Sequence, residues 1–318
     1  MSKMSTETRQ ALNGPTMGTR WSALFFAADA FDPVPVRAAL QAAVDRVDAQ
    51  MSLWKPDSDL VRLNAASVAE WVAVPAELMQ VLQLGLQIGA ASGGAFDLGL
   101  GDAVAAWGFG PEAADPARIR AALQADRRPA HEILTLDPAG GRVRKEAPLR
   151  IDLNGIAKGF GVDQLAEALR GQGIPAGLVG IDGEMRALGL RPDGRPWTVA
   201  IEAPEHNRRS PQSMLALEEA AVATSGDYRH WVEVGGRRLS HTMDPHRGAP
   251  LQAPPASVTV VARRCAEADA WATALMVLGA ERGAALARQM GLSALFLSRD
   301  ADGIAPVGVG PLFGEPPA

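Results

Sequence analysis

The stretch "RIDLNGIAKGFGVDQLAEAL", residues 150–169, joins a short apolar run to a turn and then to a helical pattern. The apolar run predicts a strand that ends at Asp152, and apolar residues at helical spacing predict a helix over 158–171. Elements of both kinds therefore follow one another closely here, which indicates a mixed fold.

Apolar runs and helical patterns occur along the rest of the chain without regular alternation. Strands are predicted at 20–27, 132–136, 142–145, 149–153, 176–182, 185–189, 196–202, 214–218, 220–224, 230–234, 257–263 and 293–298. Helices are predicted at 35–52, 75–92, 116–125, 158–171, 266–279 and 281–290. Because helices and strands are not regularly interleaved, the sequence favours an α+β fold over a doubly wound sheet, with a sheet core, flanking helices and a small helical subdomain.

We expect a single domain over residues 17–304, preceded by a disordered segment over 1–16 and followed by a loose tail over 305–318. The chain has 318 residues, of which 47% are apolar, so it can bury a sizeable core. Its formal net charge of -5 gives no general electrostatic reason to bind nucleic acid or an anionic membrane. Cys265 is the single cysteine, so we exclude an internal disulfide and expect a buried, apolar role for it.

Targeting signals are missing from the sequence as written. No stretch approaches the roughly 20 apolar residues that a membrane-spanning helix needs. The first residues lack the apolar part of a secretory signal, and no N-terminal cysteine could carry a lipid. We therefore expect a cytoplasmic protein, or a periplasmic one if a leader has been removed.

The turn inside the opening stretch could bind an anion. Small residues at Asn154 and Gly155 leave backbone groups open to a ligand, and the N-terminus of the following helix favours negative charge. Lys158 would add a mobile positive charge. The same residues also fit an ordinary strand-to-helix turn with a surface lysine. The stretch "GIAKG" is not a Walker sequence, so it does not by itself indicate a phosphate-binding loop.

A second candidate site lies in "EADAWATALMVLG", residues 267–279. Asp269 and Thr273 are four residues apart, so a helix places both on one face. A carboxylate and a hydroxyl are hard oxygen ligands suited to Mg²⁺, which uses few protein ligands and leaves positions for water and phosphate. The alternative is a solvated helix face.

Two glycine- or tryptophan-bearing loops could contact a planar ring. In residues 92–110, a Gly-Gly pair precedes Ala95-Phe96-Asp97, and a tight loop with a core phenylalanine explains this pattern equally well. In residues 51–67, Trp54 stands before a proline and a helix cap at Asp57 or Ser58; a lone tryptophan is more often part of a core than a ligand platform.

The stretch "RLSHTMDPHRGAP", residues 238–250, reads as a turn or as a catalytic loop. His241 lies between a predicted strand and Asp244-Pro245. An imidazole titrates near neutral pH and is the usual general base, which makes His241 a candidate for proton transfer.

Taken together and in order, these segments resemble the ApbE-type FAD:protein FMN transferases, formerly described as thiamine-biosynthesis lipoproteins. The resemblance covers about residues 17–298, and its specificity comes from the order and spacing of the segments. They are "MGT" from 17, "MSLWKPDSDLVRLN" from 51, "GGAFDLGLGDAVAAWGFG" from 93, "IDLNGIAKGFGVD" from 151, "VGIDGEMRALG" from 179, "AVATSGDYRHW" from 221, "SHTMDPHRGAP" from 240 and "SVTVVARRCAEADAWATALMVLG" from 257.

The resemblance implies an α+β enzyme that uses Mg²⁺ to move FMN from FAD onto a Ser or Thr hydroxyl of a partner flavoprotein, with release of AMP. It implies metal ligands at Asp269, Thr273 and the backbone carbonyl of Gly155, and it assigns His241 as base for the acceptor hydroxyl. Implied FAD contacts are Met17, Trp54, Ala95, Phe96, Asp97, Asp152, Lys158 and Met243.

This chain departs from the family pattern at several points. Exported members begin with a signal and a lipid-bearing cysteine, which this sequence lacks; Trp54 stands where tyrosine is frequent; and Ala272 stands where some members carry another carboxylate. Two other functions fit the same residues: an FAD pyrophosphatase that uses water in place of the acceptor, and a flavin-binding or delivery protein without turnover. A base together with a metal site argues against the second.

Overall fold

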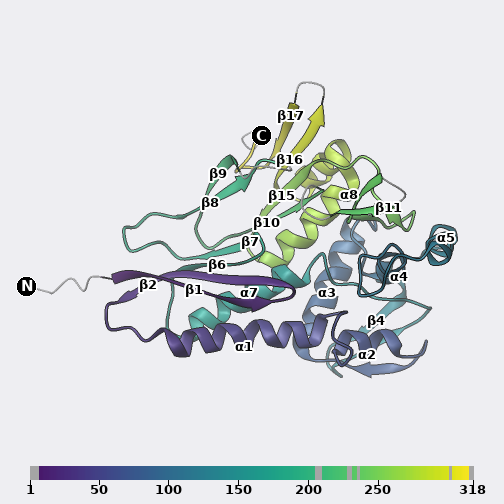
Figure 1. Ribbon diagram of the computed structural model, residues 1–318, viewed down its shortest axis with the longest axis horizontal. Coiled ribbons are helices and arrows are strands. Elements are labelled where there is room, and N and C mark those ends of the chain that lie inside the picture. Colours follow the sequence, from purple (N-terminus) through teal and green to yellow (C-terminus); the bar gives the residue numbers. More distant parts are fainter. Residues whose placement is uncertain (1–6, 205–209, 228–230, 235–236, 301–302, 315–318) are drawn as a thin grey trace, which may run out of the picture.

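The computed structural model describes residues 7–204, 210–227, 231–234, 237–300 and 303–314. An eight-stranded sheet forms its centre, in the order β1-β2-β6-β7-β10-β15-β16-β17, and every neighbouring pair is antiparallel (Figure 1). The strands are β1 (Glu7–Thr16), β2 (Thr19–Ala28), β6 (Gly177–Ile181), β7 (Glu184–Leu188), β10 (Ala221–Gly226), β15 (Ser257–Ala262), β16 (Ser293–Asp300) and β17 (Gly303–Val309). The antiparallel order confirms the α+β fold class.

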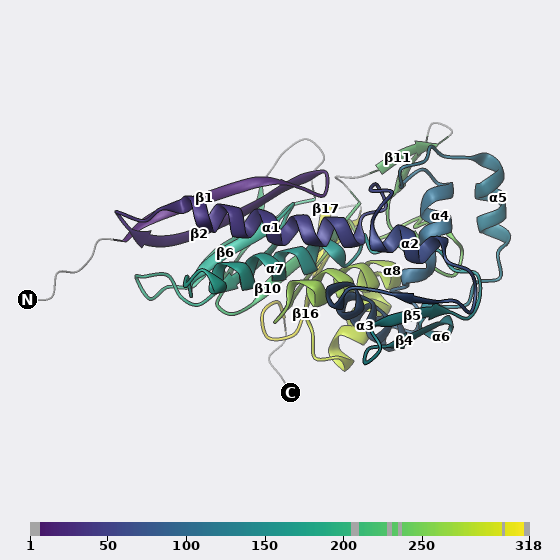
Figure 2. The same ribbon diagram turned by 90° about the horizontal axis from the view of Figure 1, so that it is seen from below.

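Three long helices cover one face of this sheet: α1 (Pro33–Met51), α7 (Ala157–Gly171) and α8 (Cys265–Gln289) (Figures 1 and 2). A ribbon of β8 (Trp197–Glu202) and β9 (Pro211–Leu217) covers part of the other face. Because neighbouring residues of a strand point to opposite faces, Val179 packs with the residues of α7, whereas Leu178 packs with Trp197. The sheet is therefore a middle layer.

A smaller lobe lies beside the ends of α7 and α8 (Figures 1 and 2). It contains α2 (Asp59–Ala65), α3 (Ala76–Ala91), η1 (Leu98–Leu100), α4 (Gly101–Ala106), α5 (Pro116–Gln124), α6 (Ala130–Ile133) and a three-stranded sheet of β3 (Trp71–Ala73), β5 (Arg142–Lys145) and β4 (Leu134–Asp137). The predicted helical subdomain thus includes a small sheet. Its core is continuous with that of the large sheet, since Leu82 and Leu98 belong to the same apolar cluster as Phe160 and Leu275.

The predicted strand at 149–153 is wrong. Ile151 and Leu153 of this segment are buried, but a side chain of α2 satisfies its backbone: Ile151 N–H donates to Asn64 Oδ1 (2.7 Å), and Asn64 Nδ2 donates to the Ile151 carbonyl (2.9 Å). The N–H of Asp152 donates to the carbonyl of Leu98 (2.8 Å). Apolar burial without a neighbouring strand produced the misleading pattern.

The expectation of loose termini is also wrong where the structure describes them. Residues Glu7–Thr16 form β1, which pairs along its full length with β2, and β17 runs to Val309 against β16. Both are edge strands: β1 consists mostly of polar and exposed residues, and a proline and two glycines interrupt β17, so neither presents the continuous apolar run that predicts a strand. Residues 1–6 and 315–318 lie outside the described parts.

Several details of the helices follow the sequence. The two predicted helices at 266–279 and 281–290 form α8, whose backbone leaves helical geometry at Gly279 (φ 76°). Cys265 is fully buried, as expected, and burial raises the pKa of its thiol well above the usual value.

The remaining short strands are β11 (Trp231–Val234), β12 (Arg237–Ser240), β13 (Met243–Asp244) and β14 (Ala249–Pro250). Within the described ranges, no helix has both the length and the apolar character needed to cross a membrane.

Candidate active site

A cavity of about 1690 Å³ opens where the hairpin tips of the large sheet meet the small lobe. All the residues singled out from the sequence as site residues line it, although they come from the β1–β2 turn, α7, α8 and four loops. They are Met17, Trp54, Ala95, Phe96, Asp97, Asp152, Gly155, Lys158, His241, Met243, Asp269 and Thr273. The fold therefore brings the whole predicted set to one place.

Two hairpin turns form one wall of the cavity. Met17 and Gly18 join β1 to β2, and Asp182 and Gly183 join β6 to β7; all four residues have positive φ angles (45°, 71°, 51° and 113°). Positive φ at both central residues is the pattern of type I′ hairpin turns, whose twist matches that of the strands. Because β2 pairs with β6, the two turns lie at the same end of the sheet.

The side chain of Lys158 is held by the second of these hairpins. Its Nζ lies 2.6 Å from Glu184 Oε1 and 3.8 Å from Asp182 Oδ2. Burial lowers the pKa of Lys158, but the charges of Glu184 and Asp269 outweigh this effect and raise the pKa above its ordinary value. Lys158 is therefore a cation held in place by an ion pair, and the expectation of a mobile charge is wrong, although its side chain stays 31% exposed.

Asp269 lies on α8 and is 5% exposed, so the alternative of a solvated helix face is wrong for it. Its Oδ2 accepts a hydrogen bond from the N–H of Gly159 (2.9 Å), and among the described residues Oδ1 accepts none. Burial and the nearby Glu184 raise the pKa of Asp269 to about 7, while Lys158 opposes that rise. One turn further along α8, Thr273 Oγ1 lies 3.2 Å from Ser225 Oγ.

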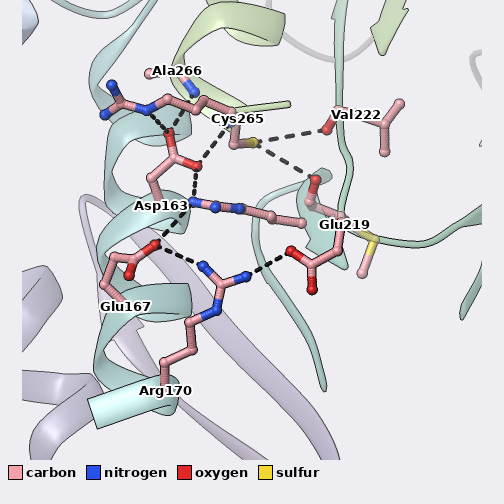
Figure 3. A network of polar contacts seen from close by, with 10 residues as sticks. Asp163, Glu167, Arg170, Glu219, Val222, Cys265 and Ala266 are labelled. Carbon is pink, nitrogen blue, oxygen red and sulfur yellow. Dashed lines mark hydrogen bonds and ion pairs between the residues drawn. The ribbon is translucent and has the colours of Figure 1, made fainter. Parts of the chain in front are cut away.

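A buried carboxylate on α7 fixes the start of α8 (Figure 3). Asp163 accepts hydrogen bonds from the N–H groups of Cys265 (2.9 Å) and Ala266 (3.1 Å), and it pairs with Arg186 at 2.8 Å. Burial raises the pKa of Asp163, and the backbone donors and Arg186 lower it in part. Since the first N–H groups of a helix have no partner inside the helix, Asp163 caps α8 from a neighbouring helix and sets the position of Asp269.

The oxygens near Asp269 suit a magnesium ion. A Cβ added at Gly155 would lie 3.1 Å from Thr273 Oγ1 and 3.2 Å from the Phe96 ring, so the backbone of this glycine lies directly against Thr273. The described residues contain no group of three or more His, Cys, Asp or Glu side chains able to hold a metal. Mg²⁺ is usually held by one or two carboxylates with further oxygens from substrate and water, so one buried carboxylate beside a hydroxyl and the backbone of Gly155 fits it.

The small lobe contributes aromatic and acidic groups to the opposite wall. Phe96 is 4% exposed, belongs to the main core and also lines the cavity. Asp97 accepts hydrogen bonds from the N–H groups of Gly99 and Ala130 (both 2.9 Å); burial raises its pKa, and these bonds oppose the rise. Burial likewise raises the pKa of Asp152 to about 6, against hydrogen bonds from Asn154.

Trp54 is 66% exposed beside the cavity, so the core interpretation of this residue is wrong. The hydroxyl of Ser52 accepts a hydrogen bond from the Trp54 N–H (3.1 Å) and orders the loop. Ser58 caps α2 through a bond from the Val61 N–H (3.1 Å), one of the two caps expected. A large flat side chain at the cavity rim is available to stack on a ring.

His241 and Met243 reach the cavity from a loop that is tied to the small lobe. Met243 packs in an apolar cluster of that lobe, and Trp107 Nε1 donates a hydrogen bond to the carbonyl of Gly248 (2.9 Å). Asp244 accepts hydrogen bonds from the N–H groups of His246 and Arg247 and so shapes the turn. The loop is therefore both a turn and a wall of the site.

Sequence reasoning missed Glu184 and its neighbour Asp182 as parts of the site. Glu184 is 4% exposed, lines the cavity and pairs with Lys158. The available signal was the Asp-Gly pair between two apolar runs, which is a strong indicator of a hairpin turn. That signal locates the turn but not the cavity beside it.

Known proteins resemble this chain in both sequence and structure. A family model described as the ApbE family matches residues 17–296. An FAD:protein FMN transferase of Vibrio cholerae is 39% identical over 92% of this chain and 88% of its own length, and one of Escherichia coli K12 is 35% identical over 92% and 84%.

Among solved structures, the flavin transferase ApbE from Vibrio cholerae has a TM-score of 0.84 at 35% identity, covering 96% of this chain and 98% of its own. The apo form of the flavinyl transferase ApbE from Pseudomonas stutzeri has a TM-score of 0.83 at 35% identity, covering 97% and 96%. Family match, identity and fold agree over nearly the whole length, and the chain belongs to the ApbE family.

Proposed function

We propose that this protein is a Mg²⁺-dependent FAD:protein FMN transferase, which moves FMN from FAD to a Ser or Thr hydroxyl of a partner flavoprotein and releases AMP. Family relatives carry the name of this activity. The observation that carries the proposal is the meeting, in one cavity, of a histidine, a fixed lysine and an oxygen set that suits Mg²⁺.

The reaction attacks a diphosphate, so the negative charge on its oxygens has to be neutralised. Lys158 supplies one positive charge at a fixed place, because Glu184 holds its ammonium group at the cavity wall. Asp269, Thr273 and the carbonyl of Gly155 would hold Mg²⁺, which would supply further neutralisation of the diphosphate's negative charge when bound. Positioning and charge stabilisation are most of the catalytic task in phosphoryl transfer.

His241 acts on the acceptor. Its imidazole takes the proton of the acceptor hydroxyl as the oxygen bonds to the phosphorus of the FMN half. The same phosphorus loses its bond to the bridging oxygen of the diphosphate, and AMP leaves with that oxygen. One hydroxyl is consumed and one phosphate ester forms for each AMP released.

The size of the cavity supports a second, protein substrate. Pockets for small molecules usually measure about 300–1,000 Å³, whereas this cavity measures about 1690 Å³. Part of its wall is formed by Ile201 and Met214 of the β8–β9 ribbon, which are not among the predicted FAD contacts. Space is therefore left for the segment that carries the acceptor hydroxyl.

The test is to incubate the protein with FAD, Mg²⁺ and a candidate acceptor domain, and to measure the acceptor's intact mass. Transfer predicts a gain of one FMN, which disappears when the target Thr or Ser is changed to Ala. Turnover of FAD without any mass gain would instead indicate the pyrophosphatase, and FAD binding without turnover would indicate the carrier protein.

A further inference from the structure

Glu184 is a buried carboxylate with only one of its two oxygens paired. Oε1 lies 2.6 Å from Lys158 Nζ, whereas Oε2 is buried and accepts no hydrogen bond from the described part of the chain. A buried acceptor that meets no donor costs free energy. The ion pair with Lys158 accounts for Oε1, whereas the unpaired Oε2 points toward a role in the neighbouring site.

Lys158 has more than one carboxylate within its electrostatic reach. Besides Glu184, Asp182 lies 3.8 Å from its ammonium, and Asp269 is close enough to contribute to the raised pKa of Lys158. Gly159, the next residue along α7, already donates its N–H to Asp269. Without Glu184, the carboxylates left beside the ammonium are Asp182, whose side chain is 31% exposed, and the buried Asp269, which contacts the residue after Lys158.

An ion pair between Lys158 and Asp269 would harm the proposed metal site in two ways. It would occupy the free oxygen of Asp269, and it would place a positive charge beside a divalent cation. We propose that Glu184 is a positioning residue, which holds the ammonium of Lys158 away from Asp269 and so keeps this carboxylate available to Mg²⁺. The proposal rests on the proposed function, because it takes Asp269 as a metal ligand.

Binding of Mn²⁺ to the FAD-free protein tests this role without measuring turnover. Mn²⁺ accepts the same carboxylate, carbonyl and water ligands as Mg²⁺, and free Mn²⁺ is counted by electron paramagnetic resonance. Glu184→Gln keeps the shape and removes the charge, and we expect it to weaken Mn²⁺ binding about tenfold. Asp193→Asn is the control, because this exposed carboxylate of the β7–β8 loop pairs with Arg191 outside the cavity lining, and we expect a change of less than about twofold.

A double-mutant cycle shows whether Glu184 acts through Lys158. In a Lys158→Met background there is no ammonium to move, so the further change Glu184→Gln is expected to weaken Mn²⁺ binding by about twofold or less. An equal loss in both backgrounds would show direct attraction of the metal by Glu184 and would overturn the proposal. Unchanged Mn²⁺ binding in Glu184→Gln alone would overturn it as well.

Glu184→Asp gives a second test that does not remove the charge. The shorter side chain withdraws the carboxylate from Lys158 Nζ, so we expect Mn²⁺ binding to weaken about threefold. Unchanged Mn²⁺ affinity would contradict a role in which the carboxylate has to contact the ammonium of Lys158. Circular dichroism of each variant verifies folding. Absence of saturable Mn²⁺ binding in the unmodified protein would contradict the metal site of the proposed function itself, a result distinct from failure of Glu184 alone.

Discussion

The N–H of Gly159 on α7 donates a 2.9 Å hydrogen bond to Oδ2 of Asp269 on α8. One helical turn further along α7, the Asp163 carboxylate accepts hydrogen bonds from the N–H groups of Cys265 and Ala266 and so caps the first turn of α8. Two helices from distant parts of the sequence are thus fastened at two successive turns. This double contact sets the position of the proposed metal ligand.

The close approach of α7 and α8 at Gly159 predicts a strong effect of a single added methyl group. In Gly159→Ala the Cβ would lie 2.4 Å from the Cys265 carbonyl oxygen and 2.8 Å from the Asp269 Cβ, so the helices must separate. We expect the free energy of unfolding to fall by about 1–3 kcal/mol, together with a higher Mg²⁺ requirement. Urea denaturation and activity at graded Mg²⁺ measure both.

Gly171→Ala, in the last turn of the same helix, is the control. A Cβ at this position would have no atom within 4 Å, and alanine favours a helix over glycine, so we expect unchanged or slightly increased stability. Equal losses for both substitutions would show that the interhelical contact is not the cause.

Removal of the Asp163 carboxylate should destabilise the protein and disturb the metal site. Asp163→Ala leaves two N–H groups of α8 without an acceptor and Arg186 without its 2.8 Å partner. Breaking a buried ion pair of this kind costs about 3 kcal/mol or more. Chemical denaturation measures the loss, and Glu167→Gln is the comparison, because that exposed carboxylate pairs with the same arginine at 3.5 Å and should cost less than about 1 kcal/mol. Similar losses for both would refute the capping role.

Asp269→Ala should shift the dependence of activity on Mg²⁺ to much higher concentration. The substitution removes the single carboxylate of the proposed ligand set and leaves a hydroxyl and a carbonyl. Initial rates at graded Mg²⁺ concentrations measure the shift. An unaltered Mg²⁺ requirement would place the metal elsewhere.

Trp107→Phe tests whether the small lobe holds the loop that carries His241. It removes the hydrogen bond from Nε1 to the Gly248 carbonyl while keeping an aromatic ring in place. We expect a loss of about 1 kcal/mol of stability and slower transfer, with the Mg²⁺ requirement unchanged because α8 is untouched. Transfer at the unmodified rate would mean that the loop does not need this bond.

His241→Ala should leave FAD binding largely intact and stop transfer. The imidazole lines the cavity, but its proposed role is toward the acceptor hydroxyl and not toward FAD. Flavin fluorescence titration measures binding, and the acceptor's mass gain measures transfer. A variant that transfers FMN at the normal rate would remove His241 from the mechanism.

Much of the fold and the site follows from local patterns in the sequence. Helices with strong apolar spacing, such as α1 and α3, occur within two residues of their predicted bounds. The edge strand β1 could not be predicted in this way, because its partners and not its own residues make it a strand. Segment 149–153 shows the opposite case, since the side chain of Asn64 replaces a neighbouring strand.

Residues of the candidate site were predictable where suitable side chains occur at a telling spacing within one segment. Asp269 and Thr273 share a helix face, so their spacing places them together. Glu184 was not predictable, because its importance depends on an ion pair with a lysine that is 26 residues away. Contacts between elements that are distant in sequence carry no local signal.

The ratio of AMP released to FMN attached tests the central claim most directly. With FAD, Mg²⁺ and an acceptor domain present in excess over the protein, transfer predicts one AMP for each acceptor that gains FMN, and no free FMN. AMP accompanied by an equal amount of free FMN, with the acceptor mass unchanged, would contradict the account.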